Sequence, residues 1–264
     1  MKTMFVILAL AAMPAFSQRP TQPGRARSDL ESAAGIGNSI ITHIADGGGW
    51  KTSIILVNLS QSKTANFKLN LLGDDGTPQQ FSFEIIGNKT DVSGALAVGG
   101  STVIKTAGTS SGVTQGWGKL DFLGTTDSVG GYAVFSNGNG NEAAVPFEST
   151  IGENPVLPFD NTNGLEMGVA LANSDFIAMT INATFKDGNG GVIGTSQFTM
   201  LPNTHTSFAL TDKWPFTAGK QGTVFFQCSD TFGSNAFGLA VLGLRFTPLG
   251  AFTSVAALQK WTLD

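Results

Sequence analysis

The sequence has 264 residues, a formal net charge of −4 and 13% charged residues, whereas 41% of its residues are hydrophobic. The acidic balance argues against nucleic acid or an anionic membrane as a partner, because both attract basic surfaces. The hydrophobic content argues against a disordered chain, and the length allows two compact cores or one large β-domain.

An export signal is predicted at the start of the sequence. Met1–Ser17 combines the positive Lys2, the apolar run Phe5–Ala12 and the small-x-small triplet Ala15–Ser17, which is the pattern of a secretory signal peptide. We therefore expect cleavage after Ser17 and a periplasmic or extracellular protein. The apolar run is shorter than the roughly 20 residues that span a bilayer, so no membrane span is expected.

Residues 18–38 are predicted to be a flexible leader, because they are rich in Pro, Gly, Arg and Ser and have little apolar surface to offset the entropy of ordering. Residues 39–147 are predicted to form a first β-sandwich, since short apolar or alternating runs are separated there by Gly, Asn and Asp turns. The Asp74–Gly76 turn predicts a hairpin between the third and fourth strands. The expected strands are Ile40–Ile44, Thr52–Leu59, Phe67–Leu71, Phe81–Ile85, Ser101–Thr106, Gly116–Leu123 and Val129–Ser136.

Residues 148–157 are predicted to form a connector, because prolines cluster around them and proline is kept out of sheet interiors. Residues 158–264 are predicted to form a second sandwich, with one helical turn at Thr211–Trp214. Its expected strands are Leu165–Ala172, Thr180–Lys186, Val192–Met200, Thr204–Leu210, Gly222–Cys228, Ala236–Phe246 and a closing strand at Phe252–Leu258.

The second half repeats the plan of the first. A polar Gly/Asn loop, an apolar run and a final Asn make up Gly47–Asn58 and come back, altered, as Asn163–Asn173. With their flanking strands, these segments predict an internal duplication. The repeated pattern resembles secreted tandem immunoglobulin-like proteins of environmental bacteria, and the resemblance covers most of residues 39–258. It implies an all-β fold of two tandem antiparallel immunoglobulin-like β-sandwiches, and it implies no particular chemistry.

No catalytic residue, metal ligand or cofactor is predicted. Gly108–Gly112 matches the G-x-S-x-G pattern of hydrolases, but its Gly, Thr and Ser neighbours favour a loop over the strand and helix that a nucleophilic serine needs. The only histidines, His43 and His205, stand at non-equivalent positions of the two halves and are expected to be ordinary surface or strand-end residues. The lone Cys228 shares an alternating face with apolar residues and is expected in the core.

Two Asp-containing turns are candidates for calcium. Asp74–Gly76 and Asp187–Gly190 offer side-chain oxygens, but Asp-Gly and Asn-Gly pairs are also the usual hairpin turns, and neither segment matches an EF-hand loop. We expect both segments to form ordinary turns, and calcium binding is the alternative.

Aromatic residues of the first sandwich are the candidate ligand-binding residues. Trp50 follows three glycines, while Trp117 and Tyr132 lie in expected strands. Flat rings of this kind stack on the apolar faces of sugars. The second half has Leu165 where the first has Trp50, so a glycan site would be confined to the first sandwich.

The sequence therefore favours an exported, non-catalytic binding, adhesion or structural protein whose partner is a protein or glycan at the cell exterior. A carbohydrate-binding module is the alternative, and a secreted hydrolase based on Ser110 is a remote one. Self-association or peptide capture through open sheet edges is a further possibility.

Overall fold

The computed structural model describes residues 39–122, 129–149, 154–230 and 238–259. Most of these residues lie in β-strands, and every pairing between the strands is antiparallel, so the all-β prediction is confirmed. The predicted signal peptide and leader lie outside the described residues. Within those residues, no helix has the length and apolar character needed to cross a membrane.

The first half folds into a pair of sheets. Apolar residues from both sheets, among them Ile44, Leu69, Ile54 and Phe135, form one buried cluster. The five-stranded sheet has the order β11 (Glu148–Ser149), β1 (Ser39–Asp46), β8 (Thr114–Phe122), β3 (Ala65–Leu72) and β6 (Asp91–Leu96). The four-stranded sheet has the order β10 (Glu142–Pro146), β9 (Val129–Asn137), β2 (Trp50–Asn58) and β7 (Ser101–Lys105).

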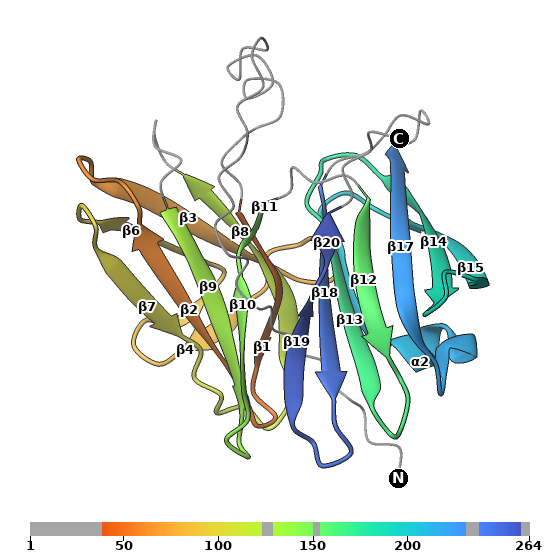
Figure 1. Ribbon diagram of the computed structural model, residues 1–264. Coiled ribbons are helices and arrows are strands. Elements are labelled where there is room, and N and C mark those ends of the chain that lie inside the picture. Colours follow the sequence, from red (N-terminus) through yellow and green to blue (C-terminus); the bar gives the residue numbers. More distant parts are fainter. Residues whose placement is uncertain (1–38, 123–128, 150–153, 231–237, 260–264) are drawn as a thin grey trace.

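The second half folds into another pair of sheets (Figure 1). Its five-stranded sheet has the order β20 (Leu258–Gln259), β12 (Pro155–Asp160), β17 (Gln221–Asp230), β14 (Met179–Asp187) and β15 (Val192–Met200). Its four-stranded sheet has the order β19 (Phe252–Ala256), β18 (Leu239–Phe246), β13 (Glu166–Asn173) and β16 (His205–Ala209). Position by position, this is the strand order of the first pair. The predicted helical turn is present as α2 (Leu210–Lys213), which a 3₁₀ turn at Pro215–Thr217 follows.

Three strands, β5 (Gly87–Lys89), β6 and β10, form where none was expected, and two further predictions differ from the structure. The segment after the Asp74–Gly76 turn forms β4 (Phe81–Phe83) and pairs with β5, whereas β3 pairs with β6 and β8. The expected hairpin is therefore limited to its first rungs, where Leu72 pairs with Pro78 and the N–H of Gln79 donates to the Leu71 carbonyl. The expected connector 148–157 contains β11 and the start of β12. Proline is tolerated in β12 because β20 reaches only as far as Val156, so no strand lies opposite the missing N–H of Pro158.

Asn58 and Asn173 hold corresponding strand ends in the same way. Each side-chain Nδ2 donates to three backbone carbonyls within 3.3 Å, and each Oδ1 accepts the N–H of the residue two positions later. The Nδ2 acceptors are Lys63, Leu96 and Ala97 for Asn58, and Ile177, Met200 and Leu201 for Asn173. These buried amides tie the β2–β3 and β13–β14 corners to the ends of β6 and β15. The Asn that closes each copy of the repeated sequence therefore has a structural role.

The two pairs of sheets pack on each other through β1, β13 and β18. In these three strands nearly every residue is buried, on both faces of the strand. Ile40 and Trp117 from the first pair form a small cluster with Ala172 and Ala240 from the second. In Figure 1, β1 and β10 stand next to β19 and β18 in the middle of the molecule. We refer to this contact as the joint.

Candidate functional site

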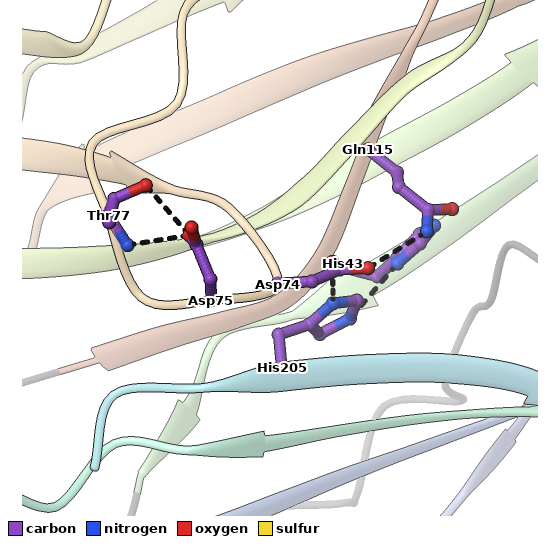
Figure 2. Close-up of polar contacts among 6 residues, drawn as sticks. All are labelled: His43, Asp74, Asp75, Thr77, Gln115 and His205. Atoms are coloured by element: carbon purple, nitrogen blue, oxygen red, sulfur yellow. Dashed lines mark hydrogen bonds and ion pairs between the residues drawn. The ribbon is translucent and has the colours of Figure 1, made fainter. Parts of the chain in front are cut away.

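A row of hydrogen-bonded polar side chains crosses the joint (Figure 2). His205, the first residue of β16, places Nδ1 2.8 Å from Oδ1 of Asp74, in the turn after β3. The His205 backbone N–H donates to the Asp74 carbonyl over 3.0 Å, and Gln115 of β8 donates to the other carboxylate oxygen over 3.1 Å. Burial raises the pKa of Asp74, but the hydrogen bond and the electrostatic attraction to His205 lower it. The pKa of Asp74 is therefore below its usual value. The turn that was predicted to start a hairpin thus anchors the second pair of sheets.

The row of polar side chains continues to His43 of β1, whose Nδ1 lies 3.2 Å from Nε2 of His205. Burial, and then the neighbouring His205, lower the pKa of His43 well below the usual 6.5. Sequence reasoning missed this pairing, because the two histidines are 162 residues apart and carry no local signal. Neither is a surface residue, since both are buried at the joint; His205 does stand at the end of a strand, whereas His43 lies inside β1, where the expectation is wrong.

The geometry of these contacts among Asp74, His205 and His43 fits a structural role better than a catalytic one. Nε2 of His43 is buried and has no hydrogen-bond partner among the described residues. A triad needs a hydroxyl or thiol bonded at that nitrogen. Ser110 lies in an exposed loop, where its backbone carbonyl accepts from Gly48. Across the described ranges, no group of three or more His, Cys, Asp or Glu side chains could hold a metal ion.

Acidification is expected to weaken the fold through His43. Its folded-state pKa is lowered, so below pH 6.5 the unfolded chain takes up a proton that the folded chain does not. The resulting loss of stability is at most about 1.4 kcal/mol per pH unit. The variant His43→Gln, which cannot titrate, is expected to lose less stability than the wild type as the pH falls. Urea unfolding of both proteins at several pH values measures this, and a difference that stays constant with pH would contradict it.

A partly buried carboxyl also lies at the joint. Glu148 of β11 accepts the backbone N–H of Val241 through Oε2 over 3.0 Å. β19 pairs with β18 only as far as Leu242, so the Glu148 side chain takes the place of a strand partner for Val241. Burial raises the pKa of Glu148 to about 8, although the Val241 hydrogen bond lowers it.

The structure does not bring the three predicted ligand-binding aromatics together. Trp117 is fully buried at the joint. Trp50 is partly buried, and its ring centroid lies 5.4 Å from that of Phe252 in the second pair. Tyr132 is 37% exposed, and it pairs with Ile55, whose side chain points to the face of the sheet opposite Trp50. Each ring would have to act alone in binding a ligand.

An open groove lies at the far side of the first pair of sheets. There β6 ends one sheet and β7 ends the other, and the groove between them has a volume of about 470 Å³. It continues into a second hollow of about 600 Å³ over β5. The side chain of Ile85, on the rim, is 93% exposed. The apolar lining consists of Phe67, Phe83, Ile85, Ile86, Val92, Leu96, Val103 and Ile104.

The corresponding region of the second pair is filled by the segment after β16, and in the first pair part of it is filled by Phe83 of β4, which is 3% exposed and bridges to Thr106. Trp214, which follows α2, is 4% exposed and packs against Phe208 of β16 and Phe198 of β15, with ring centroids 5.2 and 6.1 Å away. Nζ of Lys213 lies 4.2 Å and 4.3 Å from the centroids of the same two phenylalanines. In the first pair, the segment after β7 is the Gly/Ser/Thr loop that contains Ser110, which carries no aromatic residue.

Cys228 and the two candidate calcium turns have structural roles. The predicted burial of Cys228 is confirmed, and burial raises the pKa of its thiol to about 12. Asp187 closes the β14–β15 hairpin by accepting the N–H groups of Asn189 and Gly191. The carboxylate of Asp75 accepts from Thr77 in the other candidate calcium turn.

The chain matches no protein-family model, no curated protein and no solved structure. Its function is therefore inferred from its own residues.

Proposed function

We propose that this protein is an exported, non-catalytic binding protein that captures an extended apolar peptide in the groove between β6 and β7. We further propose that the two pairs of sheets are immunoglobulin-like sandwiches that arose by duplication. Three features support this: the signal-peptide pattern of Met1–Ser17, the matching strand order, and the matching roles of Asn58 and Asn173.

The observation that carries the binding proposal is the contrast between the two halves. The second half buries Trp214 between its edge strands β15 and β16, whereas the first half, which places Phe83 of β4 in the corresponding region, keeps an open apolar groove beside it between β6 and β7. An exposed apolar groove between edge strands is unfavourable in water, and such grooves commonly mark binding sites. A peptide in extended form would bury the groove lining and also pair its backbone with β6 or β7, as in strand addition.

Selection of a random heptapeptide display library on the purified chain tests this proposal. Selected peptides are expected to carry large apolar or aromatic side chains and to bind about tenfold or more weakly to a groove variant, Ile85→Asp together with Val103→Asp. Both positions are exposed, at 93% and 52%, so this variant is expected to fold normally.

The matched control is Leu249→Asp, which makes the same kind of change at a 95% exposed turn residue outside the groove. Selected peptides that bind the groove variant as tightly as the wild type would refute the groove. In that case, glycan-array binding that is lost in Trp50→Ala would point to the carbohydrate-binding alternative.

A further inference from the structure

The outer edge of β7 directs backbone groups toward the groove. β7 pairs with β2 on one side and ends its sheet on the other. Just past β7, the N–H of Thr106 donates to the Thr52 carbonyl, so residue 106 directs its backbone groups toward β2. This direction alternates from residue to residue along an antiparallel strand. The N–H and C=O groups of Ser101 and Val103 therefore point outward, to the side on which the groove lies.

The chain itself already pairs with one end of this edge. The N–H of Glu84 donates to the Lys105 carbonyl over 3.0 Å, and the N–H of Ala107 donates to the Ser82 carbonyl over 2.8 Å. β4 and Glu84 thus lie antiparallel to the end of β7 and the residues after it. After Glu84 the chain turns into β5. Within the described residues, no strand continues the pairing along β7 toward Val103.

Of the two strands that border the groove, β7 is the better partner for a bound strand. Thr102–Ile104 are three consecutive β-branched residues, which favour strand pairing because they pack well across a sheet. The exposed part of β6 is Ser93–Ala95, whose small side chains offer little to pack against. The β7 edge also has the start of a ladder in place, which the edge of β6 lacks among the described residues.

We infer that the peptide captured in the groove pairs with β7, antiparallel to it and in line with β4. This inference rests on the proposed function and names the class of peptide. Val103 is 52% exposed on the outer face of its sheet, whereas Ile104 packs against the core on the inner face. The peptide residue opposite Val103 then faces solvent, and its two neighbours face the groove. The partner is therefore a segment with apolar residues at alternate positions, separated by solvent-facing residues.

The direction of the bound strand fixes which peptide N–H groups point at β7. In an antiparallel pair, the peptide residue opposite Val103 exchanges both hydrogen bonds with it, so the solvent-facing residues carry the bonded N–H groups. The groove-facing residues direct their N–H groups away from β7. In a parallel pair the bonded N–H groups belong to the groove-facing residues instead. Side-chain and backbone requirements therefore alternate out of phase only for the antiparallel arrangement.

Two scans of one selected library peptide test this on the purified chain. The first replaces each residue in turn with Ala, and the second methylates each backbone nitrogen in turn. Ala is expected to weaken binding about tenfold or more at alternate, groove-facing positions. Methylation is expected to weaken binding about tenfold or more at the positions between them, because each loses a hydrogen bond to β7. Both scans alter the peptide only, so the fold of the protein is unaffected.

A pair of proline variants shows which strand the peptide joins. Val103→Pro removes an N–H that points away from β2, and an edge strand tolerates proline at such a position. The control is Ser93→Pro on β6. The N–H of Leu71 donates to the Thr90 carbonyl, so the same alternation directs the N–H of Ser93 away from β3. Val103→Pro is expected to weaken binding about tenfold or more, and Ser93→Pro is expected to change it little.

The outcomes separate this inference from the function on which it rests. Scans that fall in phase would show a parallel strand, and methylation effects without alternation would show that the peptide does not pair as a strand. Loss of binding in Ser93→Pro alone would place the peptide on β6. Each of these results overturns the inference and leaves the groove as a binding site. Peptides that bind the variant with Ile85→Asp and Val103→Asp as tightly as the wild type would overturn the proposed function itself.

Discussion

Replacing Glu148 with Gln is expected to raise the free energy of unfolding by roughly 2–5 kcal/mol above pH 8 and to leave it almost unchanged below pH 4.5. The carboxyl is held at the joint with a pKa of about 8, against 4.5 in an unfolded chain. Between these values the unfolded chain loses the proton and the folded chain keeps it. Stability therefore falls as the pH rises through this window, and the full loss is present above pH 8.

Gln keeps the carbonyl oxygen that accepts the N–H of Val241 and has no charge to bury. Denaturant unfolding at several pH values measures the effect. The matched control is Glu142→Gln on the exposed end of β10, where the same change is expected to alter stability little at any pH. Stability curves for wild type and Glu148→Gln that run parallel from acid to alkaline pH would show that the carboxyl is not held in its protonated form.

Truncating Asn173 to Ala is expected to cost about 3 kcal/mol of stability, and truncating Asn58 is expected to cost a similar amount. Each change removes a buried amide and leaves buried backbone carbonyls at a strand corner without their donor. The cost exceeds that of an ordinary hydrogen bond because an unsatisfied buried acceptor retains its full desolvation penalty. Thermal or denaturant unfolding measures it.

Asn66→Ala on β3 is the control for these truncations, because Asn66 is exposed. It is expected to change stability by less than about 0.5 kcal/mol. If Asn58→Ala or Asn173→Ala were as mild as Asn66→Ala, water would be replacing the amide, and the asparagines would not hold the corners.

Local patterns in the sequence predicted the strands well. The alternation in Phe67–Leu71 gave β3 its one buried face, and the Asp187–Gly190 turn gave the β14–β15 hairpin. The repeated Asn was visible as a pattern, but its hydrogen bonds to distant carbonyls were not. The Asp74–Gly76 turn also reverses the chain, but only Leu72 and Pro78 pair beyond it, because β6 occupies the place beside β3 that the hairpin partner would take.

The joint and the groove could not be predicted from local patterns. His43 and His205 meet only after both halves have folded, and nothing near either residue indicates the other. The groove forms where residues of β3, of β6, of β7 and of the segment after β4 come together, and no local pattern in the sequence indicates that meeting. Trp117 illustrates the same limit, since a strand aromatic gives no sign of whether it packs inside its own half or against the other.

The burial of β1, β13 and β18 on both faces has a consequence for biosynthesis. The first half leaves the ribosome before the second half has been made, so Ile40 and Trp117 have nothing to cover them during that interval. The nascent first half then carries an apolar stripe along β1 in addition to its open groove at β6 and β7, and exposed apolar surface of this kind makes a chain prone to aggregate and dependent on chaperones. The apolar surface of β1 is thus fully buried only after β13 and β18 have folded and packed against it.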